Sequence, residues 1–117
     1  MAYGLAKARP DAFYDKRQCA RRQVRRTVEI ATLTRHQIAA TVCDLSRVGC
    51  GLVTNDHVAV GSFVEIVFDE RIRPAGWVTW SRNGAFGVDF DYPLVPAAFE
   101  EILIESSLAQ MAPPFEP

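Results

Sequence analysis

One stretch decides the fold class: residues 77–90 read WVTWSRNGAFGVDF. Two short runs rich in aromatic and β-branched residues, 77–80 and 85–90, flank the pair Asn83-Gly84. An Asn-Gly pair favours the tight turn of an antiparallel hairpin, because both residues tolerate positive φ. The stretch therefore predicts two strands that pair as a hairpin.

Four further β-like runs precede this hairpin, each bounded by turn residues: 28–33, 38–43, 50–54 and 63–68. Six short strands at this spacing predict an antiparallel barrel or sandwich. Closure into a barrel would also remove the exposed edges that such short strands leave.

After residue 92 the period of the apolar residues changes to that of a helix. Pro96 suits an early helix position, and Pro113-Pro114 ends the run, so we expect one amphipathic helix at about 96–111 that packs on the strands. Its inward face would carry Phe99, Ile102, Leu103, Ser106 and Ala109 or Gln110, and its solvent face Glu100, Glu101 and Glu105. The predicted fold class is all-β with one C-terminal helix.

The chain has 117 residues and a mass of 13.0 kDa, which is ordinary for one domain. Its net charge of −1 conceals a split, because residues 1–26 carry +6 and residues 27–117 carry −7. We interpret residues 1–20 as a flexible N-terminal arm and residues 21–112 as the barrel domain with its helix. A basic segment before an acidic body predicts an electrostatic partner.

Several classes of protein are excluded by composition. No apolar run approaches the roughly 18 residues of a membrane span, and the first ten residues lack the apolar core of a secretory signal. Cys19, Cys43 and Cys50 are odd in number and form no CxxC pair, which favours free thiols in a reducing cytoplasm. His36 and His57 lack metal-ligand neighbours, and no nucleophile–base pair is visible, so we expect neither a metal site nor an enzyme.

The first motif is a basic cluster, RRQVRR, at residues 21–26. Arg21 and Arg25 are four residues apart, as are Arg22 and Arg26, so either pair can present two guanidiniums on one side. Such forks suit a phosphate or a planar base, since guanidinium binds bidentately and stacks on π systems. The alternative is a solvated basic tail, which is common for blocks of like charge.

The second motif, DLSRVG at residues 44–49, follows a predicted strand. Strand alternation places Asp44 and Ser46 on one face and Leu45 in the core, and Gly49 is expected to turn the chain with positive φ. Asp44 can accept two hydrogen bonds from adjacent donors, as on a guanine edge, and Ser46 adds a polar contact. The alternative is an ordinary Asx or Ser turn between strands.

The two motifs together, RxxxR at Arg21 and Arg25 followed by DxSxxG at Asp44, Ser46 and Gly49, resemble the signature of the PilZ domain. The resemblance runs from about residue 21 to residue 90 and includes the hairpin. PilZ domains are bacterial receptors for the second messenger cyclic di-GMP. The resemblance therefore implies nucleotide binding and a six-stranded barrel with a trailing helix.

The resemblance also implies cyclic di-GMP contacts for seven residues: Arg21, Arg22, Arg25, Asp44, Ser46, Gly49 and Trp80. The three arginines would hold the phosphates and cover the guanine faces, while the DxSxxG residues would read guanine and form the turn. The aromatic residue would offer a stacking surface, with a plain packing role as an equal alternative. Strand alternation is expected to place Val78 and Trp80 on one face and Trp77 on the other.

The overlap of Arg21/Arg25 with Arg22/Arg26 leaves two candidate pairs. Family motifs usually place the first apolar residue of the next strand three positions after the second arginine, which is here Val28 and favours Arg21/Arg25. We expect a basic arm, with five arginines in residues 17–26, that is mobile without ligand. Cyclic di-GMP would then clamp the arm over the barrel rim and create a surface for a downstream protein.

Two other functions compete with the receptor hypothesis. A PilZ-fold adaptor would bind a protein without any ligand, and the intact motifs weigh against it. Nucleic-acid binding would use the arginines, but the acidic body and the lack of interleaved aromatics weigh against it. The sequence predicts no cofactor and a monomer or weak dimer, and it leaves open whether the process is motility or biofilm regulation, and whether the ligand binds as a monomer or a dimer.

Overall fold

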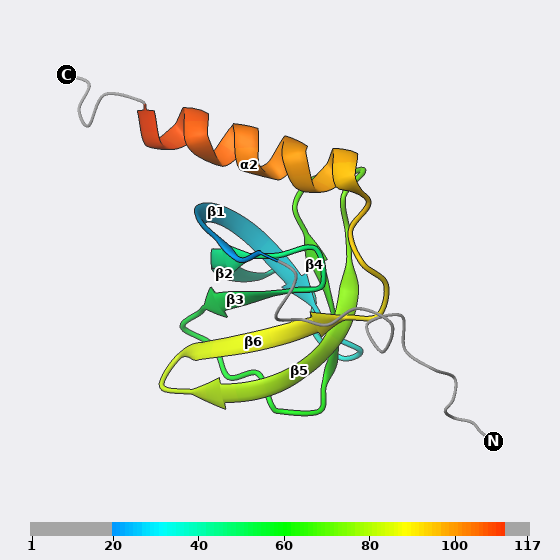
Figure 1. The fold of residues 1–117 in the computed structure, drawn as a ribbon. Helices are drawn as coiled ribbons and strands as arrows, with labels where there is room; N and C mark the ends of the chain where they lie inside the picture. The colour runs from blue at the N-terminus through cyan, green and yellow to red at the C-terminus, as the bar shows by residue number, and fades with distance from the viewer. Residues whose placement is uncertain (1–19, 112–117) are drawn as a thin grey trace.

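Six antiparallel strands close into a barrel in the computed structural model, which describes residues 20–111 (Figure 1). The strands lie in the order β1-β2-β3-β6-β5-β4 around the barrel, and one helix follows them. Their bounds are Arg22–Ala31 (β1), Ile38–Leu45 (β2), Gly49–Val53 (β3), Phe63–Val67 (β4), Ala75–Arg82 (β5), Ala85–Phe90 (β6) and Pro96–Met111 (α2). The predicted barrel and C-terminal helix are confirmed. The arm predicted for residues 1–20 lies, except for Ala20, outside the described residues.

The hairpin that decides the fold class forms as predicted. Asn83 and Gly84 have φ values of 52° and 83°, and they connect β5 to β6. Two consecutive positive φ values match the twist of an antiparallel hairpin, and Asn and Gly reach them most easily. The Asn-Gly turn therefore has the backbone conformation that antiparallel pairing of β5 with β6 requires.

The first strand begins six residues earlier than predicted. Residues 22–26 belong to β1 and pair with β2, with Arg22 opposite Leu45 and Gln23 opposite Asp44. The expectation that this basic stretch is mobile is wrong for residues 22–26. The physical reason is that Val24 is buried, so the stretch has an apolar anchor as well as a strand partner.

Helix α2 lies across one end of the barrel (Figure 1). Ile102 is fully buried, and Phe99 and Leu103 pack against the core, as the helical period predicts. Ser106 is also buried, with 2% of its surface exposed. Ala109 and Gln110 lie where side chains are not described. In the described part of the chain, no helix is both long enough and apolar enough to cross a membrane.

The acidic side of α2 is not simply a solvent face, contrary to expectation for two of its three glutamates. Glu101 pairs with Arg71, and Glu105 pairs with Arg26 at 2.6 Å. The arginines come from β1 and from the turn after β4, which both lie along this side of the helix. These pairs join α2 to the barrel in addition to its apolar contacts.

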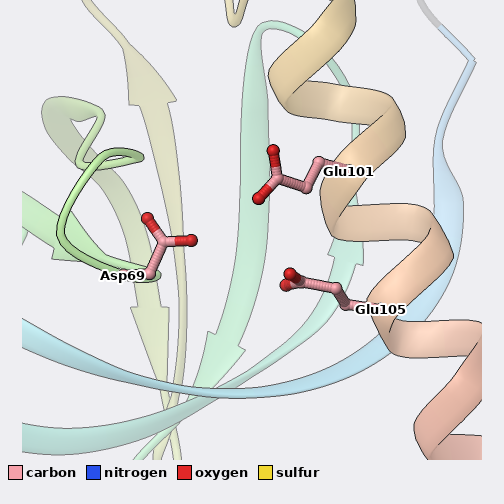
Figure 2. A group of neighbouring side chains, drawn as sticks. All are labelled: Asp69, Glu101 and Glu105. Carbon is pink, nitrogen blue, oxygen red and sulfur yellow. The ribbon is translucent and has the colours of Figure 1, made fainter.

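Figure 2 shows Glu101 and Glu105 converging with Asp69, which lies in the turn after β4. One oxygen from each carboxylate lies within 4.8 Å of the other two. Asp69 accepts hydrogen bonds from the backbone N–H groups of Ile72 and Arg71, which hold its pKa below the usual range. Each carboxylate therefore already has a donor from the protein, and the Arg71–Glu101 ion pair joins the turn to the helix.

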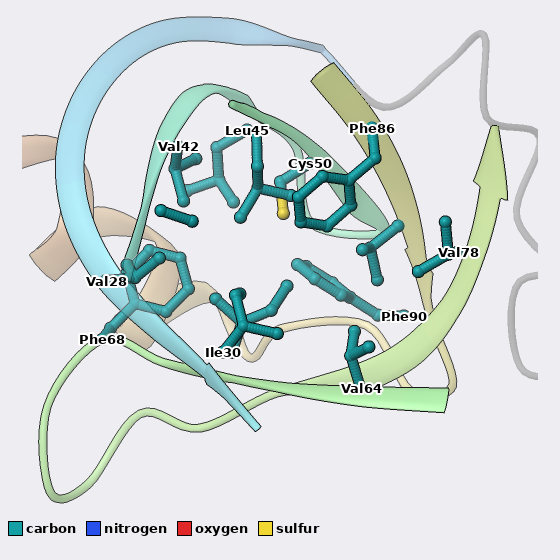
Figure 3. Packing of buried hydrophobic residues seen from close by; sticks show 14 of the residues in the cluster. Val28, Ile30, Val42, Leu45, Cys50, Val64, Phe68, Val78, Phe86 and Phe90 are labelled. Carbon is teal, nitrogen blue, oxygen red and sulfur yellow. The ribbon is translucent and has the colours of Figure 1, made fainter. Parts of the chain in front are cut away.

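The core fills the barrel with side chains from all six strands. Figure 3 shows Val28, Ile30, Leu45, Phe86 and Phe90 pointing inward, and each is almost completely buried. Each large side chain removed from water in this way contributes about 1.5–3 kcal/mol. The barrel interior is thus a packed core, and any ligand of this fold must bind outside it.

Candidate ligand-binding site

The two sequence motifs meet on the outside of the barrel, where the start of β1 lies beside the end of β2. The register places Gln23 of β1 opposite Asp44 of β2. Just before β1, Arg21 donates from Nη1 to Asp44 Oδ1 at 2.9 Å. The side chains of this pair are 54% and 38% exposed, so a single exposed ion pair joins RxxxR to DxSxxG.

Irregular strand pairing sets the direction of the Asp44 side chain. The β2–β3 register shifts between Val42 and Asp44, as at a β-bulge. Val42 and Leu45 both point into the core, while Cys43 is exposed and Asp44 is half-buried. Two successive residues therefore lie outside between two core residues, which regular alternation does not allow. The bulge makes Asp44 available at the surface.

Ser46 does not share the face of Asp44, so the alternation predicted for this motif is wrong. Ser46 is 2% exposed, and its hydroxyl accepts a hydrogen bond from the Val48 N–H at 3.1 Å. Its own N–H donates to the Gly49 carbonyl at 2.9 Å. Ser46 therefore shapes the β2–β3 turn, as the turn alternative proposes, and its contact with a ligand stays a prediction.

Gly49 is required for a reason other than the predicted one. It does not adopt positive φ; the described glycines that do are Gly61 and Gly84. A Cβ atom at position 49 would lie 2.5 Å from the Val88 carbonyl oxygen on β6. Glycine is needed here because the neighbouring backbone approaches too closely for any side chain.

Trp80 lies on the outer surface because β5 also contains a bulge. The β5–β6 register shifts between Val78, which is in the core, and Trp80, which is 45% exposed. The expectation that these two residues share a face is therefore wrong. Trp77, which is half-buried, makes an edge contact with Phe63, with ring centroids 5.0 Å apart.

Asp44 and Trp80 lie in one row of strand-paired positions. Gln23 pairs with Asp44, Asp44 with Gly51, Gly51 with Gly87, and Gly87 with Trp80, so the row crosses β1, β2, β3, β6 and β5. Sequence reasoning missed three members of this row: Gln23, Gly51 and Gly87. Their importance depends on register across non-adjacent strands, and no local pattern carries that information.

The arginines of the first motif have different surroundings. Arg22 and Arg25 are exposed. The Arg26 side chain is only 20% exposed, because it binds Glu105 and donates to the Phe68 carbonyl at 3.1 Å. The Arg25 backbone N–H donates to the Ser106 hydroxyl at 3.0 Å, so the motif is also tied to α2.

Two cysteines flank the second motif, and among the described residues both are free thiols. Burial raises the pKa of the Cys50 thiol far above its usual range, and the negative charge of Asp44 adds to the effect while Arg21 opposes it. Cys50 is therefore neutral and unreactive. Cys43 is exposed, and Cys19 lies outside the described residues.

Arg21 and Trp80 of the candidate site are exposed on the barrel surface, at 54% and 45%. Hollows of about 470, 280 and 250 Å³ occur elsewhere on the barrel. The hollow of about 470 Å³ lies between the β1–β2 loop and β4, beside Leu33, His36 and Phe63. None of the seven predicted contact residues lines any of these three hollows. An exposed arginine cluster, a carboxylate and an indole on the outer surface of the barrel suit a flat, anionic ligand.

Comparison with known proteins agrees with this geometry. No curated protein matches the sequence. The PilZ domain family matches residues 15–109, which include both motifs, the whole barrel and most of α2. PilZ domains are binding domains of cyclic di-GMP receptors. Since the match covers most of the 117 residues, the chain belongs to the PilZ family.

Proposed function

We propose that this protein binds cyclic di-GMP on the outer face of its barrel and passes the signal to a protein partner. One observation carries the proposal: the Arg21–Asp44 ion pair brings the two motifs together at the surface. An arginine and a carboxylate at 2.9 Å are both within reach of a single nucleotide. Membership in the PilZ family, whose domains bind cyclic di-GMP, supports this identity for the nucleotide.

The side chains divide the ligand between them by charge. Arg21, Arg22 and Arg25 bind the phosphates and stack on guanine faces, because guanidinium does both. Asp44 accepts hydrogen bonds from the two adjacent N–H donors of the guanine edge. Trp80 provides an aromatic surface for a base, since base–aromatic stacking is worth about 1–3 kcal/mol. The half-buried Arg26, held by Glu105, favours Arg21/Arg25 as the working pair.

Binding exchanges one set of charged contacts for another. The ligand must separate Arg21 from Asp44, and an exposed ion pair of this kind costs only about 0–1 kcal/mol to open. A phosphate of the ligand then binds the Arg21 guanidinium, and a guanine edge donates hydrogen bonds to the Asp44 carboxylate. Because residues 22–26 are already a strand, they add little of the ordering cost of about 1–2 kcal/mol per residue.

The signal has a short path to α2. The Arg25 N–H bond to Ser106 and the Arg26 pair with Glu105 connect the motif directly to this helix. A ligand that pulls Arg25 outward changes the strand to which α2 is attached. We propose that a partner protein binds α2 together with the part of the barrel rim that the ligand covers.

Titration calorimetry tests the binding site. We expect wild-type protein to bind cyclic di-GMP with an affinity that falls as salt rises, and Arg25→Ala or Asp44→Ala to weaken it at least tenfold. The matched control is Arg35→Ala, which opens the Arg35–Asp56 pair, whose side chains are 52% and 40% exposed and lie away from the motifs. Equal affinity in all variants would refute the site.

The ligand-independent adaptor is separated from the receptor by a thermal shift assay. A ligand that binds only the folded state must raise the melting temperature. Absence of any rise at saturating cyclic di-GMP would favour the adaptor. The exposed Leu33 and Phe63, which line one hollow, give such an adaptor an apolar surface.

A further inference from the structure

Two glycines lie between Asp44 and Trp80 on the outer face of the barrel. Gly51 of β3 is paired with Asp44, Gly87 of β6 is paired with Trp80, and the two glycines are paired with each other. Neither belongs to the RxxxR or DxSxxG motif. The atoms that a Cβ at each position would contact explain why glycine occurs there.

Gly51 makes room for the Asp44 carboxylate. A Cβ atom at position 51 would lie 2.6 Å from Asp44 Oδ2 and 3.2 Å from its Cγ. A contact below 3.0 Å forces one of the two groups to move. Because the Asp44 side chain is 38% exposed, the carboxylate can rotate into solvent without a backbone shift. An alanine at position 51 would therefore displace Asp44 while leaving the fold intact.

Gly87 makes room for the Trp80 indole. A Cβ atom at position 87 would lie 2.0 Å from Trp80 Nε1, 2.6 Å from Cε2 and 2.7 Å from Cδ1. The indole therefore rests directly on the backbone of β6. Any side chain at position 87 lifts it away from this strand.

Two other glycines provide the contrast. A Cβ atom at Gly49 would meet the Val88 carbonyl oxygen at 2.5 Å, and one at Gly76 would meet the Asp89 carbonyl oxygen at 2.0 Å. Backbone cannot rotate away as a side chain does, so these glycines serve the fold. Gly51 and Gly87 instead contact the far ends of side chains, and both of those side chains belong to the proposed site.

The geometry also brings the two side chains toward each other. The Asp44 carboxylate leans over β3 and the Trp80 indole lies over β6, although the residues themselves come from β2 and β5. Strands β3 and β6 are neighbours, and neighbouring strands are about 4.8 Å apart. The carboxylate and the indole are thus within reach of the same base.

We infer that Gly51 and Gly87 are positioning residues, which set the Asp44 carboxylate and the Trp80 indole where one base of the ligand meets both. The inference rests on the proposed function. It assigns no ligand contact to the glycines themselves, because they act through the two side chains that they accommodate.

Double-mutant cycles with cyclic di-GMP titration test the inference. We expect Gly51→Ala to weaken binding five- to tenfold in the wild-type background but less than twofold in an Asp44→Ala background. Gly87→Ala is likewise expected to weaken binding five- to tenfold in the wild-type background and less than twofold in a Trp80→Ala background. Equal losses in both backgrounds, or no loss in the wild-type background, would overturn the inference. Absence of binding by the wild-type protein would instead overturn the proposed function.

Readouts without ligand keep the positioning role separate from folding. The indole N–H resonance of Trp80, identified by its loss in Trp80→Ala, should shift in Gly87→Ala, and the carboxyl resonance of Asp44 should shift in Gly51→Ala. If Gly87→Ala alone fails to fold, the Gly87→Ala/Trp80→Ala double variant should fold, since the clash is removed. Gly49→Ala should lower the melting temperature more than Gly51→Ala, and the reverse order would contradict the division of the glycines.

Discussion

Arg21 and Arg26 lie at the two ends of the basic cluster, residues 21–26, and both are ion-paired, yet their surroundings differ. Arg21 has Asp44 as its partner, and both side chains are substantially exposed. Arg26 is 20% exposed, bonds to Glu105 and to the Phe68 carbonyl, and lies 5.7 Å above the Phe68 ring. The basic cluster therefore has an exchangeable end at Arg21, whose exposed ion pair a ligand can replace, and an anchored end at Arg26.

The difference separates two overlapping RxxxR pairs that the sequence alone leaves unresolved. A guanidinium with several half-buried contacts is costly to withdraw, whereas an exposed ion pair contributes about 0–1 kcal/mol. The anchored end holds β1 to α2, and the exchangeable end remains available for a ligand. The predictions below test this division, from the largest expected effect to the smallest.

Replacing Arg26 should chiefly affect stability. Arg26→Ala removes the ion pair, the hydrogen bond to the Phe68 carbonyl and the contact with the Phe68 ring. We expect the free energy of unfolding to fall by about 2 kcal/mol, since hydrogen bonds of charged groups are worth about 1.5–3 kcal/mol and this one is partly exposed. Urea denaturation measures the loss. A loss no greater than that of Arg21→Ala would contradict the anchored role.

Replacing Arg21 should have the opposite profile. Arg21→Ala opens one exposed ion pair, so we expect the free energy of unfolding to change by less than about 1 kcal/mol. Affinity for cyclic di-GMP should fall about tenfold, which is about 1.4 kcal/mol. Calorimetry and denaturation on the same samples give both numbers. A variant that binds normally but unfolds easily would reverse the two roles.

Replacing Ser106 tests the connection between the motif and α2. Ser106→Ala removes the acceptor of the Arg25 N–H bond, and we expect a loss of about 1 kcal/mol in the free energy of unfolding. Hydrogen exchange in α2 should respond to cyclic di-GMP in the wild-type protein and respond less in the variant. The neighbouring Ser107→Ala, at an exposed position of the same helix, is the control. Identical exchange in both variants would exclude this path.

Much of the fold was predictable because its determinants are local. The Asn83-Gly84 turn, the alternating strands and the 3.6-residue period after Pro96 each depend on neighbouring residues, and all three are confirmed. Part of the candidate site was also predictable, since the two motifs are intact and Arg21 of the first pairs with Asp44 of the second. The prediction failed on which side chains point into the core. Ser46 is buried, and Trp80 lies on the outer face of the sheet while Val78 lies in the core.

Both failures depend on contacts beyond the local sequence. Ser46 lies past the end of β2, where its hydroxyl accepts a turn hydrogen bond from the Val48 N–H. Trp80 lies beyond the register shift in β5, which interrupts the alternation that starts at Val78. A bulge depends on how a neighbouring strand fits, which a single strand's sequence does not record. The beginning of β1 was missed for a similar reason, because Val24 is one apolar residue among arginines and its burial is supplied by the rest of the barrel.

The smallest expected effect concerns pH at the anchored end. Hydrogen bonds from the Ile72 and Arg71 N–H groups hold the pKa of Asp69 below its usual range, and the charges of Arg71 and Arg26 add to this. A carboxyl whose folded pKa lies below its unfolded value, about 3.9, stabilises the fold above that value. This contribution is lost as pH falls below about 4 and through the folded pKa. Stability should therefore decline on acidification within that window.

Asp69→Asn isolates this contribution, because the amide oxygen can still accept the two backbone hydrogen bonds but carries no charge to titrate. Urea denaturation between about pH 2.5 and 6 should show a shallower acid decline in the variant than in the wild type. Arg26→Ala should also make the decline slightly shallower, since Arg26 contributes to the lowered pKa of Asp69. Arg21→Ala should leave Asp69 titration unchanged, because Arg21 is not among the charges acting on that carboxyl. An equal effect of both arginines would show that the two ends of the basic segment are not electrostatically separate.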